Sequence, residues 1–186
     1  MARIEPLEKP YPPEAAVFLE GSMPKWAGLE PIKLFRIWGR HPEMALALKP
    51  LGSFILSQGT LPAEDRELII LRACARCDAE YEWGIHAVGH AKRSGLGYEA
   101  IAATRNGSAD SKCFDERQRL LVNLVDALHE KATLDKDTWR ALTKIYKERQ
   151  LLELMLVAGF YHFISFTVNT LDIEPEEWAA RFPDDV

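Results

Sequence analysis

Apolar residues recur at intervals of three and four along most of this chain, and this periodicity constrains the fold more than any other feature. Val122, Val125 and Leu128, for example, are separated by polar residues at helical spacing, which is the pattern of an amphipathic helix. No alternation of apolar and polar residues persists long enough to predict a strand. We therefore predict an all-α protein.

Prolines, acidic residues and glycines mark where the predicted helices begin and end. Asp78 and Asp135 are suited to cap helix N-termini, and Gly95 is suited to end a helix. Pro50 is a candidate kink. The predicted helices are a short one after Pro31 that includes residues 34–38, then 41–58, one starting at Pro62, 79–94, 98–105, 115–131, 136–148, 150–171 and, more weakly patterned, 175–181. The helices that start at residues 62 and 79 are predicted to form a helical hairpin.

The first part of the chain differs from the rest in its proline content. Residues 1–31 hold six of the eleven prolines, and each proline removes a backbone donor and fixes φ. We expect residues 1–30 to form an extended arm with at most short helices, lying over a surface or a neighbouring subunit. The remaining residues, 31–186, have the length of one domain, and we predict a single helical domain there.

Charge and hydropathy exclude several classes of partner. The net charge is −5, and lysines and arginines are scattered among acids without a basic stripe, so no nucleic-acid partner is expected. The apolar run 151–171 is interrupted by Glu153, His162 and Asn169, so we interpret it as a buried helix and expect no membrane association.

Targeting and cysteine content favour one compartment. The N-terminal residues lack the basic, apolar and small-residue order of a secretory signal. The three cysteines are too few, and odd in number, for a secreted disulfide framework. We therefore expect a reducing, cytoplasmic location.

Two neighbouring motifs carry a family resemblance: RELIILR at residues 66–72 and AEYEWGIH at residues 79–86. This pair resembles the carboxymuconolactone decarboxylase and alkylhydroperoxidase D-like (AhpD-like) superfamily, in particular a branch with EYEW in place of a redox cysteine pair. The resemblance extends upstream through residues 31–36, 41–42 and 59–62, and downstream through Trp139 and residues 161–169. It covers roughly residues 30–175 and implies an AhpD-like helical bundle with a central helical hairpin. Because such relatives assemble through their helical faces, it also implies a homo-oligomer, a dimer or a trimer.

The resemblance implies a site without the family's nucleophile. In thiol-dependent members, a glutamate on the first helix accompanies a CxxC pair and a histidine on the second. Here the glutamate corresponds to Glu67 and the histidine to His86, but the cysteine positions hold Ala79 and Glu82. Neither residue can supply the low-pKa thiolate that peroxidase chemistry needs.

A displaced CxxC pair, Cys74 and Cys77, lies upstream of the position that the family uses. At the end of the helix that starts at Pro62, the helix dipole disfavours a thiolate, although Arg72 and Arg76 could offset this effect. Buried small residues and a displaced redox pair are the two interpretations. A lone CxxC supplies only two of the four ligands of a usual structural zinc site.

Glu82, His86 and His90 are spaced i, i+4, i+8, which places all three along one helix face. A carboxylate and two imidazoles that share one pocket are suited to general acid–base chemistry, and Glu67 could tune His86 through a hydrogen bond. A polar helix face, with Glu67 paired to Arg66 or Arg72, is the first alternative. A divalent metal bound by Glu82, His86 and His90 is the second.

Four further residues are candidates for the walls of this pocket. Tyr81 and Trp83 flank the cluster, although aromatic residues at helical spacing are more often part of a core. His162 and Asn169 share one face of the apolar helix 150–171, where a polar group needs a partner. They are expected either to complete the pocket or to pair with backbone across the core. By contrast, His129 looks like an exposed helix residue.

The leading functional hypothesis is an enzyme that moves protons on a small organic acid or lactone, by decarboxylation or isomerisation. His86 would act as the base, Glu67 or Glu82 as its partner, and Arg66, Arg72 or Arg76 would balance an anionic substrate. No cofactor is expected. A thiol peroxidase that uses Cys74 and Cys77, and a non-catalytic oligomeric binding protein, are the alternatives.

Overall fold

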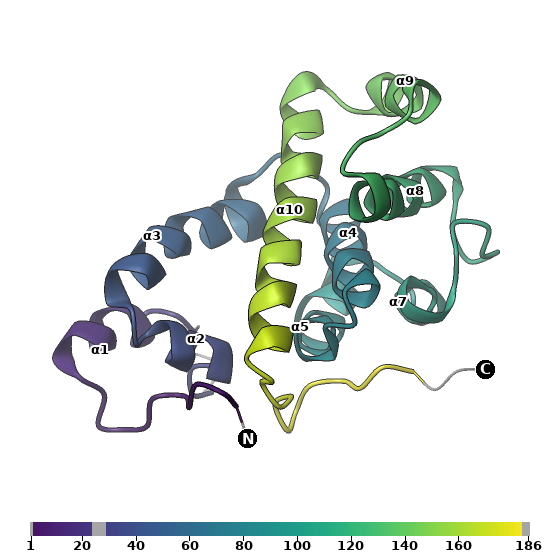
Figure 1. Cartoon of the computed structure of the whole chain (residues 1–186). Helices are drawn as coiled ribbons and strands as arrows, with labels where there is room; N and C mark the ends of the chain where they lie inside the picture. The colour runs from purple at the N-terminus through teal and green to yellow at the C-terminus, as the bar shows by residue number, and fades with distance from the viewer. Residues whose placement is uncertain (1, 24–28, 184–186) are drawn as a thin grey trace.

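The computed structural model of the chain, which describes residues 2–23 and 29–183, is built from helices and contains no strand within those residues. Two long helices, α4 and α10, lie side by side at its centre (Figure 1). In Figure 1, α1 to α3 lie on one side of α10, and the other labelled helices lie on the other. The helices are α1 (Pro13–Leu19), α2 (Lys33–Trp38), α3 (Pro42–Ser53), α4 (Ala63–Arg76), α5 (Glu80–His86), α6 (Lys92–Ser94), α7 (Tyr98–Asn106), α8 (Glu116–Lys131), α9 (Lys136–Ile145) and α10 (Glu148–Thr170). The prediction of an all-α fold is confirmed.

Several helix ends follow the local signals in the sequence. Asp115 forms a capping box with Gln118 at the start of α8, and Asp135 accepts hydrogen bonds from the first backbone amides of α9. Such caps satisfy amides that have no partner inside the helix. Gly95 ends α6 with φ 104°, a conformation that glycine adopts without steric penalty.

Two local predictions are wrong. Asp78 does not cap α5: it has φ 54°, Ala79 is the N-cap residue, and the Asp78 carboxylate pairs with Arg105. Residues 175–181 form turns and extended chain rather than a helix. This segment is instead held by tertiary contacts, such as the hydrogen bond from the Tyr81 hydroxyl to Glu176.

Two predicted helices contain π-helical turns that the sequence pattern does not reveal. The segment predicted at 41–58 consists of α3 followed by η2 (Phe54–Gln58), and α3 continues through Pro50. The segment predicted at 79–94 consists of α5, η3 (Ala87–Ala91) and α6. Single π-turns inside helices occur often at functional sites, and η3 directly follows His86.

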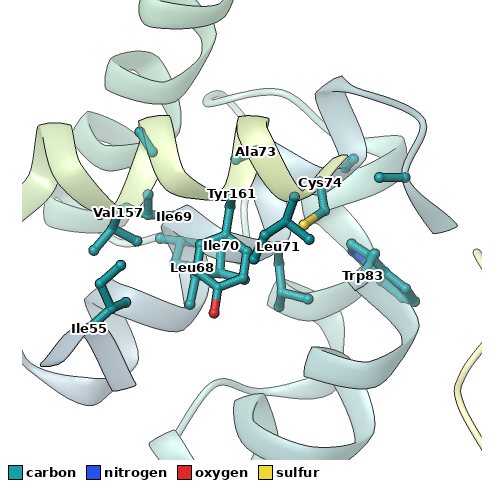
Figure 2. Close-up of a cluster of buried hydrophobic side chains, with 14 of the residues drawn as sticks. Ile55, Leu68, Ile69, Ile70, Leu71, Ala73, Cys74, Trp83, Val157 and Tyr161 are labelled. Carbon is teal, nitrogen blue, oxygen red and sulfur yellow. The ribbon is translucent and has the colours of Figure 1, made fainter. Parts of the chain in front are cut away.

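The core is centred on α4, which is surrounded by α5, α7, α8 and α10. Because neighbours cover it on several sides, the four consecutive residues 68–71 are all fully buried. Figure 2 shows these residues with Tyr161 and Val157 of α10 and Trp83 of α5. The buried stretch of α4 also includes Glu67, so its carboxylate lies inside the protein.

Helix α10 is long and apolar enough to cross a membrane by length and composition, and it is the one helix among the described residues with these properties. Within the fold, 56% of its most apolar window is buried. The buried side of α10 packs against α4 and α5, as predicted for a core helix.

The N-terminal segment packs against the rest of the chain. Phe18 and Leu19 of α1 are buried in the core, the Arg3 amide donates to the Leu171 carbonyl, and the Leu7 amide donates to the Arg36 carbonyl. The first of these hydrogen bonds holds the N-terminal segment beside the end of α10, at the bottom of Figure 1.

The C-terminal segment lies directly against α5 at Gly84. The Ala180 amide donates to the Gly84 carbonyl, and a Cβ atom at position 84 would overlap the Ala180 carbonyl oxygen. Phe182 packs against Trp83 with ring centroids 5.3 Å apart. The missing side chain at position 84 therefore permits this close approach.

Replacing Gly84 with alanine is expected to lower the free energy of unfolding by about 1–3 kcal/mol, because the C-terminal segment must move. Gly159→Ala is the matched control: it adds a methyl group within α10 where no atom lies within 4 Å, and it should be neutral or stabilising. Urea titration and limited proteolysis of the C-terminal segment measure both effects. Equal stability and equal cleavage of the two variants would show that this contact is not required.

Candidate active site

Glu67 and His86 meet in the interior of the protein. Glu67 lies on the buried side of α4, and His86 is the last residue of α5. Their side chains are 0% and 4% exposed, and His86 Nδ1 lies 2.7 Å from Glu67 Oε2. The predicted pairing of these two residues across the helical hairpin is confirmed by this geometry.

Glu82 approaches His86 from the other side of the imidazole ring. It lies one turn earlier on α5, and its Oε1 atom is 3.4 Å from His86 Nε2. The imidazole therefore stands between two buried carboxylates. Glu82 Oε2 is buried and has no hydrogen-bond partner among the described residues, which leaves an unused acceptor directly beside the histidine.

The two carboxylates determine the charge of His86. Burial alone disfavours the imidazolium, but the charges and hydrogen bonds of Glu67 and Glu82 outweigh it and raise the pKa of His86 to about 9. For Glu67, burial acts to raise the pKa, yet the charge of His86 and its hydrogen bond lower it below the usual value. At neutral pH the pair is thus an ion pair.

His90 and Tyr161 enclose the ring of His86. His90, in η3, stacks on it with ring centroids 4.8 Å apart, and Tyr161 of α10 meets it edge-on at 5.0 Å. Burial and the positive charge of His86 lower the pKa of His90 to about 4, so His90 is neutral at pH 7. His90 is half-buried whereas His86, Glu67, Glu82 and Tyr161 are buried, which makes His90 the member of the cluster nearest to solvent.

Of the three arginines considered as anion partners, Arg66 is the one in contact with this cluster, because its Nε atom donates to Glu67 Oε1 at 3.1 Å. Arg72 instead binds Asp126 through two nitrogens, and Arg76 binds Glu130. The prediction that Glu67 could pair with Arg66 is therefore correct, and this ion pair coexists with the one to His86.

Tyr81 and Trp83 have structural partners outside the cluster. The Tyr81 hydroxyl accepts from the Leu34 amide and donates to Glu176, while the Trp83 Nε1 atom donates to Thr104 Oγ1 at 2.9 Å. Both side chains are buried. The structure thus makes them anchors of α5, as the core interpretation predicted, and gives no support to their place in a substrate pocket.

His162 and Asn169 belong to a different cluster from the one predicted. His162 Nε2 lies 3.0 Å from His129 Nδ1, and Asn169 Nδ2 donates to the Cys77 carbonyl. Both contacts are at the C-terminal end of α4, whereas Glu67 lies in its first half. The prediction that these two side chains complete the His86 pocket is corrected accordingly, and the alternative of pairing with backbone is the one observed, since His162 Nδ1 also lies 2.8 Å from the Ala158 carbonyl oxygen. Tyr161, the neighbour of His162 in sequence, packs on His86 instead.

The environment of the displaced cysteine pair disfavours thiolates. Burial raises the pKa of Cys74 well above its usual value, and the nearby charge of Glu82 raises it further. Burial also raises the pKa of Cys77. Because a thiol peroxidase needs an accessible, low-pKa thiolate, the interpretation of Cys74 as a buried small residue is favoured over the redox alternative.

The metal alternative for Glu82, His86 and His90 is not favoured either. Both nitrogens of His86 face carboxylates, with Glu67 at Nδ1 and Glu82 at Nε2, and a protonated imidazole has no lone pair to offer a metal. Among the described residues, the group with metal-ligand spacing is Cys77, His129 and His162.

Sequence reasoning missed two residues that shape this region. Tyr161 packs on His86, and its only signal was its place in a resembling segment. Glu153 was interpreted as an interruption of the apolar run, but it is buried and accepts hydrogen bonds from the amides of Thr60 and Leu61. It thereby fixes the loop before α4 and also lines a small hollow with Gly59, Leu61 and Val157.

Comparisons with known proteins agree with this fold and motif. The Carboxymuconolactone decarboxylase family matches residues 42–121, which include α4, α5 and the Glu67–His86 pair. No curated protein sequence is similar enough to match the chain. The matched region carries the two motifs that resemble the carboxymuconolactone decarboxylase and AhpD-like superfamily, and the match supports that resemblance.

Three solved structures illustrate the similarity of fold. A peroxidase-related protein from Silicibacter sp. TM1040 has a TM-score of 0.79 at 15% identity, covering 96% of this chain and 93% of its own. The debrominase Bmp8 has a TM-score of 0.77 at 20% identity, covering 94% and 92%. A protein of unknown function from Agrobacterium tumefaciens, described as a putative antioxidant defence protein AhpD, has a TM-score of 0.66 at 20% identity, covering 73% and 92%. At these identities the likeness concerns the fold alone.

Proposed function

We propose that this protein catalyses proton transfer on a small organic acid or lactone, with isomerisation or decarboxylation as the outcome. The observation that carries the proposal is the buried row Glu67, His86 and Glu82, in which Glu82 Oε2 has no hydrogen-bond partner. Unpartnered buried carboxylate oxygens are costly. A substrate proton beside Glu82 would remove this cost.

The charge of His86 reverses the role that the sequence suggested. With a pKa of about 9, His86 begins the reaction protonated, so it is suited to donate a proton or stabilise negative charge rather than to act as the base. Glu82 is the better base, because its Oε2 atom has no hydrogen-bond partner among the described residues. Glu67 keeps His86 charged and oriented, which makes Glu67 a positioning residue.

For an isomerisation, Glu82 takes a proton from the carbon next to a carbonyl group. The electron pair of that C–H bond forms an enolate, and the Nε2–H of His86 stabilises its oxygen. The contact of this N–H with Glu82 is long, at 3.4 Å, so it can turn to the substrate at little cost. Glu82 then returns the proton to a different carbon of the enolate, and the enzyme regains its starting charges.

For a decarboxylation, the bond from carbon to the carboxylate breaks, carbon dioxide leaves, and the electron pair enters the conjugated carbonyl system. The proton that then joins carbon comes from His86 and is replaced from water. Both reactions pass through an enolate-like anion next to the same cation. A small ring is compatible with this fold in at least one relative, because a cysteine-to-alanine variant of the debrominase Bmp8 has been solved in complex with 2,3,4-tribromopyrrole.

The proposal is tested by hydrogen–deuterium exchange in D₂O with a panel of small unsaturated lactone acids and 3-oxo acids. We expect the protein to accelerate exchange at the carbon next to the carbonyl of at least one probe, as measured by proton NMR. Glu82→Gln should slow this exchange by about 100-fold or more. Glu99→Gln, on the exposed surface of α7, is the matched control and should leave the rate unchanged.

Two results would contradict the proposal. If Glu82→Gln folds normally and exchanges the probe as fast as the unaltered protein, Glu82 is not the base. If no probe in the panel exchanges faster than it does in buffer, this substrate class is wrong.

A further inference from the structure

A second cluster of potential metal ligands lies apart from the Glu67–His86 site. Cys77 is the C-cap residue of α4, His129 is in the last turn of α8, and His162 is in the second half of α10. These residues are far apart in the sequence, and the packing of three helices brings them together. One ligand atom from each lies within 4.8 Å of the others.

The distances between these atoms suit a tetrahedral metal ion. His129 Nδ1 is 3.0 Å from His162 Nε2 and 3.9 Å from Cys77 Sγ. Zinc bonds of about 2.0–2.1 Å to nitrogen and about 2.3 Å to sulfur give ligand separations of roughly 3.4 and 3.6 Å at tetrahedral angles. Shifts of a few tenths of an ångström would bring these two separations to the tetrahedral values. The third separation, from Cys77 to His162, lies within 4.8 Å, and rotation of the Cys77 side chain would bring it toward the same range.

A second observation, independent of the spacing, is the orientation of the ligands. His162 Nδ1 lies 2.8 Å from the Ala158 carbonyl oxygen, which requires a proton on Nδ1 and leaves a lone pair on Nε2. A histidine ligand of a metal is commonly oriented in this way by a backbone carbonyl. In addition, Asn169 Nδ2 donates to the Cys77 carbonyl at 2.6 Å, which fixes the backbone that carries the thiol.

We propose that Cys77, His129 and His162 form a binding site for a zinc-type divalent cation. The donor set of one thiolate and two imidazoles is typical of zinc, and three protein ligands leave the fourth position to water or a small ligand. Cys77 and His162 are half-buried and His129 is exposed, so the ion can enter from solvent. On binding, the Cys77 thiol loses its proton to water, and the proton on His129 Nδ1 moves through solvent to Nε2 of the same ring, which frees the Nδ1 lone pair for the ion.

The proposal does not depend on the proposed function. None of the three ligands belongs to the Glu67, His86 and Glu82 row, and the predicted redox role of Cys77 is replaced by a ligand role. It also resolves the objection that a lone CxxC is short of ligands, because the two histidines come from α8 and α10 rather than from a second cysteine pair.

The experiment uses the full chain after dialysis against a chelator. After Zn²⁺ is added and the protein is desalted, we expect it to retain about one equivalent of the ion, as measured by elemental analysis. With Co²⁺ as the probe, we expect the visible bands of a tetrahedral complex and a thiolate-to-cobalt charge-transfer band. Zn²⁺ should also raise the Tm, because the ion binds the folded state, and it should protect Cys77 from alkylation.

Matched variants separate the site from general effects. Cys77→Ser should abolish the charge-transfer band and weaken binding by roughly 100-fold, and His129→Gln should weaken it similarly. Because His129 is exposed, its variant should fold normally. Cys113→Ser and His41→Ala, which remove a thiol and an imidazole elsewhere, should bind as the unaltered chain does. Failure to retain metal, or equal binding by all five proteins, would overturn the proposal.

Discussion

Replacing Glu67 with glutamine is expected to lower the free energy of unfolding by about 3 kcal/mol at pH 6. The carboxylate of Glu67 is fully buried, and it contributes more than Glu82 to the rise in the pKa of His86 from 6.5 to about 9, a shift that corresponds to about 3 kcal/mol. Removing one partner of a buried ion pair leaves the other charge without compensation. Urea titrations of both proteins measure the difference.

The free energy of unfolding that the Glu67→Gln variant loses should depend on pH, and the loss should become smaller in alkaline solution. Because folding raises the pKa of His86, its stabilisation is fully present below pH 6.5 and is lost as the pH rises through about 9. Folding lowers the pKa of Glu67, so its contribution is present above its ordinary value of 4.5 and is lost in more acidic solution. The two proteins should therefore differ most between about pH 4.5 and 6.5 and should converge above pH 9.

Glu99→Gln makes the same chemical replacement at an exposed position. This control should show no such pH-dependent difference in stability. The assigned charge of His86 would be wrong if the Glu67→Gln variant lost as much stability at pH 10 as at pH 6. Between pH 6.5 and 9 the titration of His90 does not interfere, because its pKa in the folded protein is about 4.

Replacing Arg72 with methionine is expected to lower the free energy of unfolding by about 3–5 kcal/mol. Two nitrogens of this buried guanidinium donate to Asp126 of α8, and a third donates to the carbonyls of Thr104 and Gly107, around the end of α7. The variant leaves two carbonyl oxygens without their donor, and it leaves Asp126 with the longer ion pair to Arg76, at 3.5 Å. Arg72→Lys should recover only part of the loss, because lysine cannot form the two parallel hydrogen bonds.

Arg140→Met is the matched control for this prediction. The Arg140 side chain is 72% exposed in its ion pair with Asp137, and exposed ion pairs contribute little to stability. Its free energy of unfolding should change by less than about 0.5 kcal/mol. A comparable loss in both variants would mean that the network around Arg72 has no special role in joining α4, α7 and α8.

The parts of the fold that the sequence predicted correctly depend on local chemistry. Asp115 and Asp135 cap the helices that follow them, and Gly95 ends one, because each effect involves atoms only a few residues apart. Asp78 carried the same signal as these caps, yet its carboxylate pairs with Arg105 on α7. That contact depends on how α4 and α7 pack, which a local pattern does not contain.

The same distinction, between local signals and contacts that depend on packing, applies to the candidate site. The pairing of Glu67 with His86 could be predicted from two motifs on one helical hairpin. The charge of His86 could not, because it results from two carboxylates that approach opposite sides of the ring in a buried space. The proximity of Cys77, His129 and His162 was also beyond the sequence, since it requires the relative placement of three helices, and His129 by itself was correctly predicted to be exposed.

Tyr161 and His162 are consecutive residues of α10, but they contact different clusters. Tyr161 packs on His86, and His162 packs on His129. Successive side chains on a helix point about 100° apart. Helix α10 therefore contributes one residue to the Glu67–His86 site and the next to the cluster of Cys77, His129 and His162. Any rotation of α10 about its axis would move both side chains and would disturb both clusters at once. A substitution that changes how α10 packs is therefore expected to affect both clusters, even when it lies far from either of them.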